Sequence, residues 1–293
     1  MRRPSTLPSG NRELESRAGS MTSIYFRKTY QRTFGTFPLK GESAREAVRT
    51  AVSVGYRSFD TAQSYGNEAD IGETLAESGV AREDLCITTK VKPDNFPSDR
   101  FIASVEQSLR NLGVDFVDVL LLHWPPLDAD ILPSFTLLQQ ARDRGLARHV
   151  GVSNYTVSMM RKAAATANGP IACNQVEFHP LIDQSVLLAA AVETGIPLSS
   201  HCSVARGAVF GIPLMQELAR AYDVTVAQIT LRWILQKGVS VNAMSTKPDH
   251  IMHNFQTMHF TLSSIDMARI DALNAVNTRL ITRDVAPFAP VWD

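Results

Sequence analysis

Four polar side chains are spaced so that they could protonate a carbonyl oxygen. Asp60, Lys90 and His123 each close an apolar run, and Tyr65 comes shortly after Asp60. A free tyrosine has a pKa of about 10, too high for easy proton transfer at neutral pH. A nearby lysine ammonium favours the phenolate and lowers that pKa. We therefore predict that Lys90, paired with Asp60, activates Tyr65 as the proton donor. His123 would hydrogen-bond the carbonyl oxygen.

Each of these residues taken alone has an ordinary structural explanation. An Asp–Lys pair inside a barrel is often structural, a single strand-end histidine is more often a core residue, and a loop tyrosine says little. Only their combination favours catalysis.

The elements that would hold these residues repeat along the chain. From about residue 30, apolar runs recur at intervals of roughly 25–40 residues, the period of a strand–helix unit. Several are apolar at nearly every position, as in parallel strands covered on both faces. The sequence of 293 residues thus predicts an α/β fold, a single-domain (β/α)8 TIM barrel. The predicted strands are Tyr30–Phe34, Tyr56–Asp60, Leu85–Lys90, Val117–His123, His149–Ser153, Ala172–Glu177, Ile196–His201 and Val239–Ala243.

Three of the intervening stretches begin at a capping residue and continue with apolar residues on one helical face. They are a helix capped by Ser43 that buries Ala47, Val48, Ala51 and Val52, one capped by Asn67 that buries Ile71 and Leu75 and stops at Gly79, and one capped by Thr225 that buries Ile229, Leu231 and Ile234 and stops at Gly238.

Polar residues follow the predicted strands at the end where a TIM barrel carries its active site. One such residue could be a chance loop position, but seven of the eight predicted strands have one. They are Asp60, Lys90, His123, Ser153 with Asn154, Gln175, His201 and Ser245.

Five segments give the sequence a specific resemblance. They are Gly55–Glu68 (GYRSFDTAQSYGNE), Ile87–Lys90, Leu122–Pro125, Gly151–Tyr155 and Asn174–Pro180. In order and spacing they resemble the aldo-keto reductase family, from about Phe34 to the end of the chain. The resemblance implies NADPH-dependent reduction of aldehydes or ketones to alcohols. It also implies that Asp60, Tyr65, Lys90 and His123 form the catalytic tetrad.

The cofactor would lie across the barrel mouth, since the sequence lacks the Gly-x-Gly-x-x-Gly of a Rossmann domain. The family resemblance assigns the nicotinamide carboxamide to Ser153, Asn154 and Gln175, which offer donors and acceptors. It also brings the first strand end, Gly35–Thr36, towards the cofactor. His201 stands where many members stack a tyrosine or phenylalanine on the nicotinamide, so we expect weaker cofactor binding.

The adenosine end of the cofactor is predicted at a helix start. Ser245, Thr246 and Lys247 precede Pro248, and a helix N-terminus with a lysine and two hydroxyls suits a 2′-phosphate. The family usually has a lysine before the serine and an arginine five residues after it. Those positions are Met244 and His250 here, so Lys247 is expected to supply the charge. Asn254 would meet the adenine, and NADPH is favoured over NADH.

Trp124, next to His123, is expected to wall the substrate pocket as it does in the family. The short tail after Asn277 and the run Thr88–Val91 look most like bacterial 2,5-diketo-D-gluconate reductases. That likeness implies keto-sugar acids or small reactive aldehydes such as methylglyoxal as substrates. Arg279 is a candidate to bind a substrate carboxylate.

Composition narrows the partners. Lys plus Arg and Asp plus Glu both number 29, so a dedicated nucleic-acid binder is not expected. No apolar run reaches the length of a membrane span. Three cysteines in no metal or disulfide spacing indicate a reducing compartment and buried thiols, and the scattered histidines predict no metal site. The cysteines are Cys86, Cys173 and Cys202. A cytoplasmic monomer acting on a small carbonyl compound is the simplest prediction.

Residues 1–20 are polar and lack the apolar stretch of a secretory signal, and Glu13 and Glu15 disfavour the alternative of a transit peptide. We predict a disordered extension, a cloning remnant or a start assigned too early, with the reductase domain at residues 21–293. Two other functions stay open from the sequence. One is a cofactor-binding regulatory protein on the same fold, and the other is a TIM-barrel lyase or metal-dependent hydrolase.

Overall fold

Eight parallel strands form a closed barrel in the computed structural model, which describes residues 24 and 30–293. Each strand pairs with the next one in the sequence, and β1 pairs with β8 to close the ring. This confirms the predicted (β/α)8 TIM barrel. The strands are β1 (Arg32–Gly35), β2 (Ser58–Asp60), β3 (Cys86–Val91), β4 (Val117–Leu122), β5 (Ala147–Ser153), β6 (Ile171–Glu177), β7 (Leu198–His201) and β8 (Ser240–Ala243).

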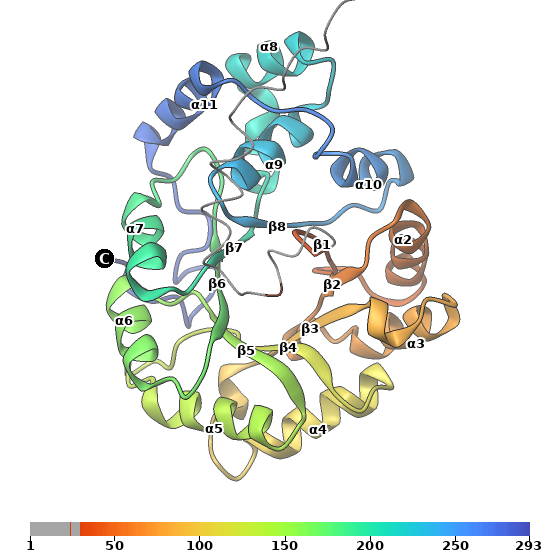
Figure 1. Ribbon diagram of the computed structural model, residues 1–293, viewed down its shortest axis with the longest axis vertical. Coiled ribbons are helices and arrows are strands. Elements are labelled where there is room, and N and C mark those ends of the chain that lie inside the picture. Colours follow the sequence, from red (N-terminus) through yellow and green to blue (C-terminus); the bar gives the residue numbers. More distant parts are fainter. Residues whose placement is uncertain (1–23, 25–29) are drawn as a thin grey trace, which may run out of the picture.

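Helices connect the strands and surround the barrel (Figure 1). The α-helices are α2 (Gly41–Val54), α3 (Glu68–Glu77), α4 (Phe101–Leu112), α5 (Leu132–Asp143), α6 (Val157–Thr166), α7 (Ser185–Thr194), α8 (Pro213–Ala221), α9 (Val226–Gln236), α10 (Pro248–Phe255) and α11 (Ser264–Asp271). Short 3-10 helices are η2 (Gln63–Tyr65), η3 (Arg82–Asp84), η4 (Pro93–Asn95), η5 (Ala205–Gly211) and η6 (Ala272–Val276).

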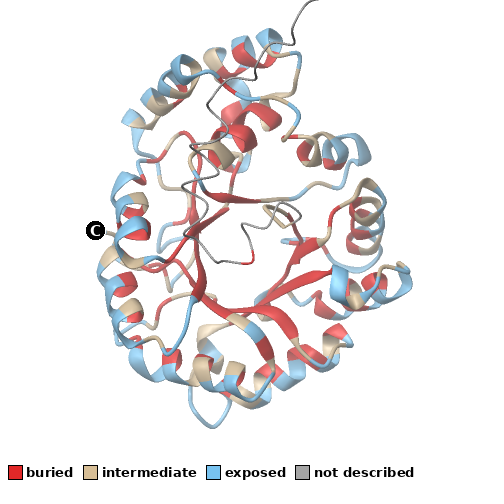
Figure 2. Ribbon diagram, viewed as in Figure 1, coloured by how far each residue is buried: buried red, intermediate tan, exposed pale blue. Residues whose placement is uncertain are grey.

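The core lies within the barrel and between the barrel and its helices. Figure 2 shows buried residues along the strands and on the inward faces of the helices, with exposed residues facing outward. All residues of β3 and β4 are buried, as expected for strands covered on both sides. Each fully buried valine, leucine or isoleucine contributes about 1.5–3 kcal/mol to stability, so this core fixes the positions of the strand ends.

The predicted helix starts have mixed outcomes. Thr225 forms the predicted cap, because its Oγ1 accepts from Gln228 N at 3.2 Å and Gln228 Oε1 accepts from Thr225 N at 3.0 Å. Ser43 is not a cap, since α2 already begins at Gly41. The Gly41 amide donates to the carboxylate of Asp70 at 2.8 Å, so the neighbouring helix satisfies it.

Helices α3 and α4 approach closely because α3 contains a glycine. A Cβ built on Gly72 would lie 2.3 Å from the carbonyl oxygen of Leu112 at the end of α4. The buried residues Ile71 and Leu75 flank this contact, as the sequence predicted for α3.

None of the described helices is long and apolar enough to cross a membrane. The proposed extension at residues 1–20 lies outside the described residues. The domain boundary at residue 21 therefore stays a prediction.

Candidate active site

A cavity of about 540 Å³ opens at the carboxyl ends of the strands. Most residues predicted for the site line it, and they come from all parts of the chain. These are Gly35, Thr36, Asp60, Tyr65, His123, Trp124, Ser153, Asn154, Gln175, His201 and Asn254. Lys90 is fully buried directly behind this wall.

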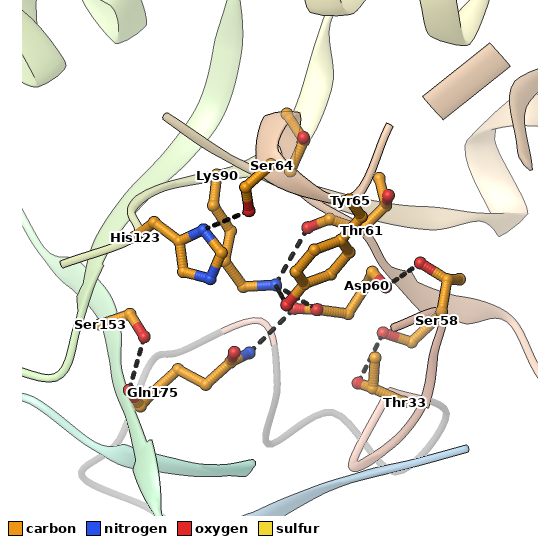
Figure 3. Close-up of polar contacts among 12 residues, drawn as sticks. Thr33, Ser58, Asp60, Thr61, Ser64, Tyr65, Lys90, His123, Ser153 and Gln175 are labelled. Atoms are coloured by element: carbon orange, nitrogen blue, oxygen red, sulfur yellow. Dashed lines mark hydrogen bonds and ion pairs between the residues drawn. The ribbon is translucent and has the colours of Figure 1, made fainter. Parts of the chain in front are cut away.

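Lys90 hydrogen-bonds two of the other predicted catalytic residues, Asp60 and Tyr65 (Figure 3). Its Nζ donates to Asp60 Oδ1, to the carbonyl oxygen of Thr61 at 2.9 Å and to Tyr65 Oη at 3.3 Å. The predicted pairing of Asp60 and Lys90 beside Tyr65 is therefore confirmed as geometry. Burial lowers the pKa of Lys90, but the charges and hydrogen bonds of Asp60 and Tyr65 together raise it by more, so the ammonium stays charged.

The pKa of Tyr65 differs in direction from the sequence prediction. Burial raises it above the ordinary value and outweighs the lowering effect of the Lys90 charge. The expected lowering is therefore only one contribution, and it is the smaller one. The phenol consequently stays protonated at neutral pH, which is the state a proton donor needs.

Asp60 has a second polar partner besides Lys90. Gln175 Nε2 donates to Asp60 Oδ2 at 2.8 Å, so each carboxylate oxygen has a donor. Asp60 ends β2 and Gln175 lies on β6, and the bond crosses the barrel interior. A buried carboxylate is costly unless it is paired and hydrogen-bonded, and both conditions are met here.

His123 lies beside Tyr65 at the cavity wall. The two rings are edge-on, with centroids 5.5 Å apart, and Ser64 Oγ lies 3.2 Å from His123 Nδ1. Burial, followed by the Lys90 charge, holds the pKa of His123 well below its usual value. The imidazole is therefore neutral, with one N–H donor to offer a carbonyl oxygen.

Two loops that carry the site are held together by Asn67. Its Nδ2 donates to the carbonyl oxygens of Thr36 at 3.1 Å and Leu39 at 2.9 Å, and its Oδ1 accepts from Thr61 Oγ1 at 2.6 Å. Asn67 occupies the N-cap position of α3, as predicted, but makes no side-chain capping bond. Its side chain instead forms hydrogen bonds with the loops after β1 and β2.

The predicted carboxamide-binding residues form one hydrogen-bonded group. Ser153 Oγ donates to the Gln175 carbonyl at 2.8 Å, and Asn154 Nδ2 donates to Ser153 Oγ at 3.0 Å and to the His123 carbonyl at 3.1 Å. His201 Nε2 lies 2.9 Å from Asn154 Oδ1. Burial lowers the pKa of His201 to about 4, so this imidazole is neutral too.

Only some of the residues at the predicted binding site for the adenosine end of the cofactor line the cavity. Met244 and Asn254 line the cavity, and Pro248 begins α10 as predicted. Four others do not line it and lie beyond its edge, on the loop before α10 and in the first turn of that helix. They are Ser245, Thr246, Lys247 and His250. Lys247 is exposed, and its amide donates to Ser245 Oγ at 3.1 Å.

The loop after β7 contributes residues that the sequence did not single out. Cys202, Arg206 and Asn242, the last from β8, line the cavity. Cys202 was expected to be buried, but it is only partly buried, because it follows the end of β7 and lines the cavity. Its backbone is left-handed, with φ 53°. Arg206 also has a left-handed backbone, with φ 51°. Sequence patterns give no signal for such a loop.

Arg279 does not face the cavity as a substrate-binding cation would. Its guanidinium lies over the ring of Trp292, 3.9 Å from the centroid. Among the described residues lining the cavity, Arg206 is the only arginine or lysine.

The comparison with known protein families decides the identity. The aldo/keto reductase family matches residues 32–275. The chain belongs to the aldo/keto reductase family. An aldo/keto reductase relative, methylglyoxal reductase DkgB of Escherichia coli O157:H7, is 38% identical over 262 residues, which is 88% of this chain and 97% of the relative.

Solved aldo/keto reductase structures share the fold. A crystal structure described as a candidate 2,5-diketo-D-gluconic acid reductase B has a TM-score of 0.87 and 37% identity, covering 95% of this chain and 99% of its own. The Bombyx mori aldo-keto reductase in complex with NADP has a TM-score of 0.80 and 30% identity, covering 88% and 94%. The predicted fold and family are therefore confirmed.

Proposed function

We propose that the chain is an NADPH-dependent reductase that converts aldehydes or ketones to alcohols, with Tyr65 as the proton donor. The observation that carries this proposal is the contact of 3.3 Å between Lys90 Nζ and Tyr65 Oη at the wall of an open cavity. Membership of the aldo/keto reductase family supports it, as does the NADP bound to the Bombyx mori relative.

The chain's own residues fit a nicotinamide cofactor. Besides its bond to Asp60, Gln175 has a carbonyl oxygen and a second amide proton, which suit a carboxamide. Ser153 and Asn154 lie next to Gln175 and supply further polar groups. Gly35 allows the Asn242 side chain to pack against the end of β1 at the cavity wall, because a Cβ there would lie 2.4 Å from Asn242 Oδ1. When bound, the cofactor supplies the hydride.

Tyr65 provides the proton in this proposal. A phenol with a raised pKa is fully protonated at neutral pH and can donate as the carbonyl oxygen gains charge. Lys90 then stabilises the phenolate, and Asp60 keeps Lys90 charged and in place. His123, which is neutral, orients the carbonyl oxygen by a hydrogen bond.

The preference for NADPH over NADH is part of the proposal. Lys247, with Ser245, Thr246 and the start of α10, would meet the 2′-phosphate at the cavity edge, with His250 beside it. Arg206 adds a cation on the cavity wall for the cofactor's phosphates. Gly35 and Thr36 would approach the cofactor at the end of β1, His201 would stack on the nicotinamide, and Asn254 would meet the adenine.

We propose keto-sugar acids of the 2,5-diketo-D-gluconate type, or small aldehydes such as methylglyoxal, as substrates. The names of the two similar proteins support these classes. Trp124 and Phe37 give the cavity an apolar wall beside Tyr65, and the Phe37 ring lies 5.1 Å from the Tyr65 ring. From the family we further propose a cytoplasmic monomer, which sedimentation and cell fractionation would test.

Tyr65→Phe tests the proton donor. NADPH and NADH oxidation are followed separately with a panel of aldehydes and keto acids. Because general-acid catalysis contributes about 10²–10⁴-fold, turnover should fall by that factor. The dissociation constant for NADPH should change little. Tyr222→Phe removes a phenol outside the cavity and serves as the matched control. A fully active Tyr65→Phe protein would refute the assignment.

A further inference from the structure

We propose that Glu177 is a positioning residue that determines substrate size selectivity, because its buried carboxylate holds the C-terminal segment as one wall of the cavity. This inference rests on the proposed reductase function. It concerns residues 277–286, which follow the last helix and return to the barrel mouth. Figure 1 shows the C-terminus of the chain beside α6 and α7.

The Glu177 carboxylate accepts three hydrogen bonds, two of them from the C-terminal segment. Oε1 accepts from the amide of Leu280 at 2.7 Å and Oε2 from the amide of Ile281 at 2.9 Å. Oε1 also lies 2.8 Å from His179 Nε2. Glu177 ends β6 and is 1% exposed, so these bonds are shielded from water.

His179 fixes the carboxylate from the other side. The amide of Leu181 donates to His179 Nδ1 at 3.3 Å, so Nδ1 acts as the acceptor and Nε2 carries the proton given to Glu177. Burial would raise the pKa of Glu177, but the bonds from His179, Leu280 and Ile281 together lower it. The group is therefore a charged acceptor at neutral pH.

The residues held by Glu177 form part of the cavity surface. Ile281 lines the cavity, as do Val285 and Ala286 a few residues later. The segment has further ties before this point, since the amide of Thr278 donates to the Leu181 carbonyl at 2.7 Å and Asn277 Oδ1 accepts from the Asp183 amide at 3.1 Å. The hydrogen bonds of Asn277 and Thr278 fix where the segment starts. The hydrogen bonds to Glu177 then fix how far Ile281 projects over the opening of the cavity.

Glu177→Gln changes this arrangement without changing the size of the side chain. Two carboxylate oxygens accept three donors in the native protein. A glutamine replaces one oxygen with an NH₂ group, which would meet an N–H donor. At least one of the amides of Leu280 and Ile281, or the His179 ring, then loses its acceptor. The apolar wall should loosen, which favours larger substrates.

The experiment compares wild type, Glu177→Gln and Asp118→Asn. Asp118 is the matched control, because it is a strand carboxylate that is 2% exposed and accepts a backbone amide, from Ile87 at 2.9 Å. It does not line the cavity. Three quantities are measured: kcat and KM for methylglyoxal and for the bulkier 4-nitrobenzaldehyde, the dissociation constant for NADPH, and hydrogen exchange at the amides of Leu280 and Ile281.

For Glu177→Gln we expect the ratio of kcat/KM for the small aldehyde over the bulky one to fall by about tenfold. The change should come mainly through KM, because the catalytic residues are untouched. NADPH binding should change less than about twofold, since Glu177 lies outside the cofactor contacts proposed above. Exchange at residues 280 and 281 should accelerate. Asp118→Asn should lower stability while leaving both the ratio and this exchange unchanged.

An unchanged substrate ratio in Glu177→Gln, or an equal change in Asp118→Asn, would overturn the inference. If wild type oxidises NADPH with neither aldehyde nor any keto acid of the panel described above, the proposed function fails. Exchange at residues 280 and 281 that stays as slow in Glu177→Gln as in wild type refutes the positioning role of Glu177 by itself. Should circular dichroism show Glu177→Gln to be unfolded, Glu177→Asp replaces it. That variant keeps the charge but shortens the reach, so a smaller shift of the same sign is expected.

Discussion

Removing the lysine of the buried ion pair should destabilise the fold more than any surface charge does. Lys90 is fully buried and Asp60 is 2% exposed in its side chain, so Lys90→Met leaves a carboxylate without a cation inside the barrel. Loss of one partner of a buried pair costs about 3–5 kcal/mol. The Gln175 amide still donates to Asp60 Oδ2 at 2.8 Å, so we expect the lower half of that range.

The assay is urea unfolding at pH 7 of wild type, Lys90→Met, Asp60→Asn and the double variant. The double variant removes both charges. Its loss in free energy of unfolding should therefore be smaller than the sum of the losses in the two single variants by about 1–3 kcal/mol. Arg49→Met is the control. Its ion pair with Glu42 has an N–O distance of 2.7 Å, but the two side chains are 49% and 65% exposed. That loss should stay below about 1 kcal/mol.

Two results would refute this reasoning. One is a Lys90→Met loss no greater than the Arg49→Met loss, which would mean that water reaches the pair. The other is strict additivity in the double variant, which would mean that Lys90 and Asp60 act on stability independently.

The remaining predictions concern pH and packing. The pKa of His201 is lowered to about 4 by burial, whereas an unfolded chain protonates this group near the ordinary value of about 6.5. The unfolded state thus binds the extra proton, so stability should fall as the pH falls from about 6.5 to about 4, and His201→Tyr should lessen that slope in urea unfolding at pH 7 and pH 5. His201→Tyr should also bind NADPH more tightly in a fluorescence titration, and an unchanged dissociation constant would count against the stacking role. Gly72→Ala should destabilise the protein by about 1–3 kcal/mol, because its Cβ would lie 2.3 Å from the Leu112 carbonyl oxygen. Helix propensity alone predicts the opposite sign, so a stabilised variant in thermal unfolding would show that α3 and α4 can separate.

The strands and the residues at their ends could be predicted from the sequence because both follow from one periodic pattern. A parallel strand covered on both faces reads as a continuous apolar run, and β4 is the clearest case. The end of each run then places Asp60, Lys90 and His123 at one rim, since the strands of a parallel barrel all point the same way. The contact between Lys90 and Tyr65 followed from this placement.

The parts that were missed depend on three-dimensional surroundings that no local pattern encodes. Ser43 does not cap α2, because Asp70 from another helix accepts the first amide. The net direction of the Tyr65 pKa depends on how deeply the phenol is buried. Arg279 stacks on Trp292, which lies in the C-terminal tail and belongs to none of the predicted strand ends. Glu177 was noted only as part of a motif, since its partners at 280 and 281 come about a hundred residues later.

Closure of the barrel has a consequence for association between molecules. Every strand from β1 to β8 has a neighbour on both sides, so among the described residues the sheet presents no free edge on which another chain could add a strand. This protection depends on all eight strands, because the barrel cannot stay closed when one strand detaches. If the three-residue β2 comes loose, β1 and β3 are both bared at once. The closed barrel therefore protects the folded protein from edge-to-edge association, whereas a partly opened barrel would expose two strand edges and be prone to aggregate.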